Sequence, residues 1–194
     1  MRLTAHGVNR HQAWPVKWTP WEDIMSATDV TRSEGVPAEW LKHGLIGGII
    51  AGIVFAAFEM IAATILDGPD MFFMPLRMIG GIALGEQALD PAYSLVTAGV
   101  AGLVVHLVLS AVYGIGVAGV ARYVPALASS PAILIGWASI AGLALWLVNF
   151  YAIAPITGWN WFPDGTNAVV QFIAHTFFYG TVLGIYLNAV ARRS

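Results

Sequence analysis

Four polar side chains lie inside otherwise apolar runs of this chain, and their types are the ones that could do chemistry: Glu59, His106, Asn149 and His175. At a rise of about 1.5 Å per helical residue, the four fall near one depth if the run around His106 projects by a turn. A carboxylate at that depth costs on the order of 3 kcal/mol. We therefore expect Glu59 to be neutral, paired or bound to a metal.

Three functional readings follow from these side chains. In the first, His106 and His175 bind a b-type haem as cofactor. In the second, Glu59, His106 and His175 bind a non-haem metal, because a carboxylate with two imidazoles is a ligand set for iron or zinc. In the third, the same residues relay protons or bind a quinone headgroup. The structural alternative is a hydrogen-bond network that holds the helices in register.

The composition indicates the protein class. The chain is 58% hydrophobic and 10% charged, against about 25% charged in an ordinary soluble domain. Four apolar runs are each long enough for the roughly 20 helical residues that cross a bilayer, at about 44–66, 94–122, 131–155 and 168–190. We expect an all-α membrane protein with four transmembrane helices in a bundle over 37–194.

Several function classes find no signature in the chain. It has no cysteine, which excludes disulfides and thiolate metal sites. It also lacks a phosphate-binding glycine loop, a GxSxG elbow and an HExxH motif. No basic stripe indicates a nucleic-acid partner. The first residues, MRLTAHGVNRHQAWP, precede no apolar stretch, so we expect no cleavable signal peptide.

The predicted N-terminal arm, residues 1–36, is cytoplasmic and rich in tryptophan. Thr19, Pro20 and Glu22 form a helix-start pattern that predicts a short helix to about Thr28, and Pro37 is expected to begin the helix of the first span. The tryptophans in and beside the arm either sit at the lipid headgroups or bind a partner subunit. These residues are Trp14, Trp18, Trp21 and Trp40.

The segment at about 71–89 is too short to span a bilayer and predicts an external interfacial or re-entrant helix, broken at Gly80-Gly81. Met71, Met74 and Met78 share one face of it, either as apolar filler or as a soft-metal ladder. On the other external loop, Trp159, Trp161 and Phe162 are expected to mark the membrane surface.

The chain also matches itself at two offsets, which predicts two tandem helical hairpins. Each matched set occupies one stripe of its helix, and small residues spaced by four let membrane helices approach closely. The polar network is therefore predicted to include Gln171 and Tyr179 beside the four residues above. At an offset of 90 residues, the match is between one set and a later one: Gly48, Gly52, Phe55 and Glu59 match Ala138, Gly142, Leu145 and Asn149. At an offset of 69 residues, Gly102, His106 and Ser110 match Gln171, His175 and Tyr179.

The segments AGIVFAAFEM, at 51–60, and GLVVHLVLSAVYGIGVAGV, at 102–120, resemble segments of small four-helix bacterial integral membrane proteins without an assigned activity. The resemblance covers residues 44–125 and rests on the apolar pattern with one glutamate and one histidine. It implies a lineage and implies no mechanism.

Together these observations predict a non-catalytic or accessory integral membrane subunit of a larger, bioenergetic membrane complex, with other membrane subunits and the lipid bilayer as partners. The alternatives are a haem- or metal-binding electron-transfer protein and a small transporter. The expected location is a bacterial-type inner (plasma) membrane.

Basic residues in the short flanks predict that both termini are cytoplasmic, since Arg77 is the only one on the opposite side. A reporter fused at Ser194 that is active only in the cytoplasm should give full signal, and one active only in the periplasm should give none. The reverse result would overturn both the orientation and the count of four spans. The other basic residues are Arg2, Arg10, Lys17, Arg32, Lys42, Arg122, Arg192 and Arg193.

Overall fold

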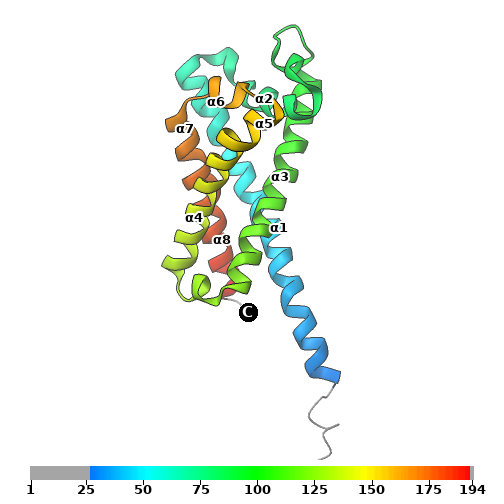
Figure 1. Cartoon of the computed structure of the whole chain (residues 1–194), viewed down its shortest axis with the longest axis vertical. Helices are drawn as coiled ribbons and strands as arrows, with labels where there is room; N and C mark the ends of the chain where they lie inside the picture. Colours follow the sequence, from blue (N-terminus) through cyan, green and yellow to red (C-terminus); the bar gives the residue numbers. More distant parts are fainter. Residues whose placement is uncertain (1–26, 193–194) are drawn as a thin grey trace, which may run out of the picture. The chain divides into compact units, whose positions relative to one another are not determined.

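The structure is a computed structural model that describes residues 27–192, with side chains described from Glu39 to Arg192. Throughout that part of the chain the secondary structure is helical (Figure 1). The chain divides into two compact units, Met1–Gly35 and Val36–Ser194. The second unit holds the bundle and the cavity described below.

Four stretches of helix are long and apolar enough to cross a membrane, as predicted: Glu39–Asp67, Leu95–Tyr123, Pro131–Thr157 and Ala168–Ala191. The helices along the chain are α1 (Ala27–Asp67), η2 (Pro69–Met71), α2 (Met74–Leu84), η3 (Glu86–Leu89), α3 (Leu95–Tyr123), η4 (Pro125–Ala128), α4 (Pro131–Val148), η5 (Asn149–Ile153), α5 (Ala154–Thr157), α6 (Trp161–Asp164), α7 (Ala168–Ile173), η6 (Ala174–Thr181) and α8 (Val182–Ala191). Here η2, η3 and η4 are 3₁₀-helices, whereas η5 and η6 are π-helices.

Side-chain caps set where three of the membrane helices begin. Ser94 accepts the amide of Thr97 at the start of α3, and Ser130 accepts the amide of Ile133 at the start of α4. Asn167 accepts two amides at the start of α7. Each cap satisfies backbone donors that the helix itself leaves unpaired, so the polar residue just before each apolar run fixes the helix start.

The α1 and α3 helices cross at a stripe of small residues. A Cβ added at Gly44 would lie 2.8 Å from the carbonyl oxygen of Gly114, and one added at Gly48 would collide with the carbonyl oxygen of Ser110. The two backbones therefore touch with no side chain between them. This contact turns the same face of α1, seven and eleven residues further on, toward the inside of the bundle.

A second close crossing joins α4 to η6 and α8. A Cβ at Gly142 would collide with the carbonyl oxygen of His175, and one at Gly180 would lie 2.5 Å from the carbonyl oxygen of Ala138. One at Gly184 would lie 2.8 Å from the Cα of Ile135. The two crossings thus hold α1 to α3 and α4 to the last helix.

Helix α2 packs against α3 at the end of the bundle where Figure 1 shows α2, α5 and α6 gathered. A Cβ on Gly102 of α3 would collide with the carbonyl oxygen of Leu76, and one on Gly80 of α2 would lie 2.5 Å from that of Ala98. Trp161 of α6 donates its indole N–H to the carbonyl oxygen of Met78 over 3.1 Å. The two loops at this end are thereby joined.

Two local expectations are wrong. Helix α2 runs without a break through Gly80 and Gly81 and ends at Gly85, whose φ of 81° is the left-handed backbone that favours glycine. The pair of glycines instead permits close contact with α3 and with Trp161. The first span does not begin its helix at Pro37, because α1 already begins at Ala27.

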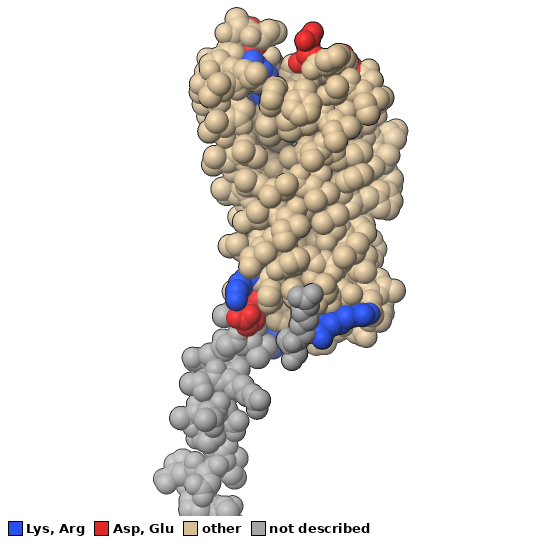
Figure 2. All heavy atoms as spheres, turned by 180° about the vertical axis from the view of Figure 1, so that it is seen from behind, with Lys and Arg blue, Asp and Glu red and all other residues tan. Residues whose placement is uncertain are grey.

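Charged side chains gather at the two ends of the bundle on the face that Figure 2 shows, and the band between them is uncharged. Arg122 lies in the last turn of α3, and Arg192 follows α8. On α2, the guanidinium of Arg77 donates to the carbonyl oxygens of Ala88, Asp90 and Tyr93 at 3.0 to 3.1 Å. Arg77 therefore holds the loop between α2 and α3 against α2 by three hydrogen bonds.

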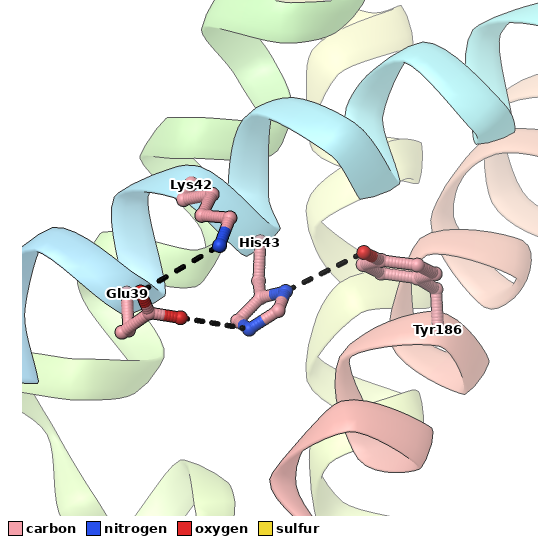
Figure 3. A network of polar contacts seen from close by, with 4 residues as sticks. All are labelled: Glu39, Lys42, His43 and Tyr186. Atoms are coloured by element: carbon pink, nitrogen blue, oxygen red, sulfur yellow. Dashed lines mark hydrogen bonds and ion pairs between the residues drawn. The ribbon is translucent and has the colours of Figure 1, made fainter.

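Polar contacts at Glu39 to His43 tie α1 to α8 (Figure 3). Glu39 lies 3.7 Å from Lys42 and 3.4 Å from His43, and the Nδ1 atom of His43 lies 3.4 Å from the hydroxyl of Tyr186. Exposed ion pairs of this kind contribute at most about 1 kcal/mol. Their role is to fix which side of α1 faces α8.

The Gly102→Ala substitution should lower the free energy of unfolding by about 1 to 3 kcal/mol, because the new methyl group would push α2 away from α3. Gly99→Ala is the matched control on the same helix, since nothing lies within 4 Å of a Cβ there. Denaturant titrations in mixed micelles would measure both. Equal stability of the two variants would contradict the close approach.

Candidate functional site

One cavity of about 420 Å³ lies between the helices at the α2 and α6 end of the bundle. Its wall is mostly apolar and includes all six side chains of the predicted polar network. These residues come from α1, α3, η5, α7 and η6, and they are Glu59, His106, Asn149, Gln171, His175 and Tyr179. The cavity is therefore the candidate site.

Glu59 makes one of the two hydrogen bonds that join side chains of the cavity wall to each other among the described residues. Its Oε2 atom accepts a hydrogen bond of 2.9 Å from the Nε2 atom of Gln171. Both residues are buried, with 7% and 4% of their surface exposed. The other carboxylate oxygen, Oε1, is buried and has no hydrogen-bond partner among the described residues. A buried acceptor without a partner normally calls for a ligand, a water or a proton donor.

The two histidines donate to backbone carbonyl groups rather than to Glu59. His106 Nε2 lies 2.8 Å from the carbonyl oxygen of Gly52, and His175 Nδ1 lies 3.0 Å from that of Gln171. A carbonyl oxygen only accepts, so these nitrogens carry the hydrogens. The second nitrogen of each ring is left as an acceptor when the imidazole is neutral.

The remaining members of the predicted network bond to Tyr113, which sequence reasoning did not name, and to Ser110, which it named only as part of the repeat. Tyr113 donates to the Oδ1 atom of Asn149 over 3.0 Å, and Tyr179 donates to the carbonyl oxygen of Ser110 over 2.6 Å. The spacing could have predicted that Ser110 and Tyr113 lie near the site, because they follow His106 by four and seven residues and so share its helix face. The polar groups thus line one cavity without forming one closed ring.

Aromatic rings surround the two imidazoles. The ring centre of Phe55 lies 5.3 Å from that of His106 and 4.8 Å from that of His175. Phe150 contacts His175 edge-on at 5.6 Å. A haem held by both histidines needs an open slot for a flat macrocycle, whereas here one phenyl ring contacts both imidazoles. The side chains present do not fit the group.

The predicted metal ligands share the cavity but do not converge on one point. Within residues 39–192, no three histidine, aspartate or glutamate side chains are arranged to hold a metal ion. Glu59 bonds to an amide, while His106 and His175 each bond to a carbonyl group. The geometry therefore offers hydrogen-bonding and apolar contacts rather than a three-ligand metal centre.

Methionines and the two loops form the outer part of the cavity wall. Met71, Met74 and Met78, which the sequence places on one helical face, all line the cavity. Trp159 and Phe162 of the other loop line it as well, and Phe162 packs 5.3 Å from Phe150. The aromatic cluster expected at the membrane surface thus helps to cover the cavity.

The π-helices were not foreseen from the sequence. Segment η5 begins at Asn149, and η6 contains His175 and Tyr179, so both wide turns lie at the cavity. Such turns are rare and occur frequently at functional sites. No residue type indicates a π-helix. A prediction that assumes the α-helical period therefore gives the directions of these side chains only approximately.

Of the four tryptophans predicted to bind a partner, only Trp40 lies within the described residues. Trp14, Trp18 and Trp21 lie outside the described residues. Trp40 is partly buried and packs against the core cluster that includes Leu134. Its contacts are therefore with the bundle itself.

Comparison with known proteins adds no family to this geometry. No family model, no curated protein and no solved structure matches the chain.

Glu59→Ala should lower the free energy of unfolding by about 1 to 3 kcal/mol more than Glu59→Gln, because alanine leaves the buried amide of Gln171 without its acceptor. Glutamine keeps a carbonyl oxygen in that place. Unfolding in mixed micelles, followed by circular dichroism, would compare the two.

Glu39→Ala is the control, since it removes a 60% exposed carboxylate from the same helix and should change stability by under about 0.5 kcal/mol. Equal losses from Glu59→Ala and Glu59→Gln would mean that the bond to Gln171 does not hold the helices together.

Proposed function

We propose that this protein is a non-catalytic integral membrane subunit whose bundle binds a small amphipathic molecule in the cavity around Glu59. The observation that carries the proposal is that Glu59 lines a cavity of about 420 Å³ and that its buried Oε1 atom has no hydrogen-bond partner among the described residues. A cavity of this size falls within the range of small-molecule sites, about 300 to 1,000 Å³. Such sites combine apolar walls with a few polar groups that orient the ligand.

The arrangement of the wall supports a molecule with one polar end. The polar side chains Glu59, His106, Gln171 and His175 come from facing helices, while apolar, aromatic and methionine side chains make up most of the rest. A polar headgroup would bond to the carboxylate, and an apolar body would occupy the remainder. The reduced form of a quinone headgroup, whose hydroxyl groups can donate to a carboxylate, or another lipid-soluble molecule taken from the bilayer has this form.

We also propose the orientation that the basic flanks predict, with both termini cytoplasmic in a bacterial-type inner membrane. The cavity then lies in the outer half of the bundle, and α2 lies at the outer surface. Arg77, the basic residue on that side, is engaged by three carbonyl oxygens. Its presence there has a structural reason and does not weaken the charge rule.

The tandem repeat is part of the same proposal. Gly52 contacts the side chains of His106 and Ser110, and Gly142 contacts the backbone of His175. The offset of 90 pairs Gly52 with Gly142, and the offset of 69 pairs His106 with His175. In each hairpin a glycine of one helix thus lies against a histidine of the next, once at its side chain and once at its backbone, and this pairing supports a duplication.

A role as accessory subunit of a larger bioenergetic complex remains the proposed context. Apart from the bundle, the chain offers the tryptophan-rich arm as a surface for other membrane subunits. Binding of a quinone-like molecule would suit such a complex. We expect no nucleic-acid partner.

Filling the cavity should abolish binding. Ala63 lines the cavity, so Ala63→Trp should reduce the amount of any bound small molecule at least about tenfold, since the indole would occupy its space. The measurement is solvent extraction of purified protein followed by mass spectrometry, together with titration by Nile red, a neutral dye that fluoresces in apolar surroundings.

Ala57→Trp is the matched control, because Ala57 is exposed on the same helix and lies off the cavity wall. It should extract and bind like the unsubstituted protein. If the two tryptophan variants and the unsubstituted protein all behave alike, the cavity binds nothing and the proposed function fails.

A further inference from the structure

The charge of the cavity wall is one-sided. Glu59 and Asp67 both line it, and no lysine or arginine among the described residues does. The nearby cation on α2, Arg77, is engaged by the carbonyl oxygens of Ala88, Asp90 and Tyr93 and is absent from the wall. An anionic headgroup would therefore meet acidic groups without a basic partner, which costs free energy in an apolar site.

Glu59, the two histidines and the two tyrosines of the wall have no free hydrogen to offer a ligand, whereas Asn149 and Trp159 keep N–H donors. The Oε1 atom of Glu59 is buried and unpaired, and its Oε2 atom already accepts from Gln171. His106 and His175 direct their N–H groups to carbonyl oxygens, so a neutral ring of either offers only a lone pair to the cavity. Tyr113 and Tyr179 likewise donate their hydroxyl hydrogens elsewhere. A ligand that donates hydrogen bonds or carries positive charge complements this wall.

Aromatic and thioether groups complete the complementarity. The rings of Phe55, Phe150, Phe162 and Trp159 line the cavity beside Glu59. The negative face of an aromatic ring attracts a cation within about 6 Å. The methionine sulfur atoms of α2 are polarizable and fit apolar groups of irregular outline. Two carboxylates without a basic partner among the described residues, together with aromatic rings and thioethers, suit an organic cation.

We propose that the ligand of this cavity is a lipophilic organic monocation, such as a quaternary ammonium with an apolar body, paired with the Glu59 carboxylate and enclosed by the aromatic rings. The inference rests on the proposed function, since it names the class of molecule that the same cavity binds. Glu59 supplies the charge, and its bond to Gln171 holds the carboxylate at the cavity wall.

The test compares two probes of the same outline, benzyltrimethylammonium and its uncharged carbon counterpart neopentylbenzene. Ligand-observed NMR titrations on the full chain in neutral micelles give the dissociation constant of each, with Ala63→Trp as the background for binding outside the cavity. The cation should bind at least about tenfold more tightly than the neutral probe. Glu59→Gln should weaken cation binding by about 30-fold or more, and neutral binding by less than about twofold.

The outcomes distinguish a failure of the cation assignment from a failure of the proposed function. If the neutral probe binds as tightly as the cation, or if Glu59→Gln leaves cation binding intact, the cation assignment is wrong while the proposed function stands. If neither probe binds beyond the Ala63→Trp background and Nile red also fails to bind, both proposals fall. The comparison of the two probes on the unsubstituted protein does not use Glu59→Gln, so a folding defect in that variant would not rescue the proposal.

Discussion

No Cβ fits where α1 crosses α3 at Gly48, or where α4 crosses η6 at Gly142, and the position of the cavity follows from that restriction. Backbones in contact fix the rotation of each helix about its axis. Glu59 lies eleven residues beyond Gly48, on the same face of α1, and is therefore directed into the bundle. Without these contacts the polar side chains would have no enforced direction in a membrane, where apolar helix faces gain little by avoiding lipid.

Several polar side chains inside the bundle form hydrogen bonds with backbone carbonyl oxygens. His106 and His175 bond to carbonyl oxygens of crossing or preceding turns, and Tyr179 bonds to the carbonyl oxygen of Ser110. These bonds hold the rings in place whether or not the cavity is filled. The Oε1 atom of Glu59 differs from these groups, because it is buried and has no hydrogen-bond partner among the described residues. Arg122, Trp146 and Thr176 also each have one buried atom without a partner among those residues, but Glu59 is the only one of the four that lines the cavity.

The sequence was sufficient for the four spans, because uninterrupted apolar runs have one physical explanation, and the polar interruptions led to the residues on one cavity wall. It was insufficient for their bonds. The pairing of Glu59 with Gln171 joins residues on different helices, and the contact of Tyr113 with Asn149 depends on a wide turn that no residue type announces. The unbroken helix at Gly80-Gly81 was missed because glycine favours both chain breaks and close packing, and only the neighbouring α3 decides between them.

The wide turns η5 and η6 also affect how this chain can change in length. Deleting a residue from a regular helix such as α3 turns everything after it by about 100° and would bring core positions round to the lipid. A π turn already holds one residue more than an α turn, so loss of a single residue from Ala174–Thr181 converts it to a regular turn. The faces before and after would keep their directions, with Leu183 and Leu187 still in the core. Deletion of a single residue should therefore be better tolerated in these two segments beside the cavity than in the regular helices of the bundle.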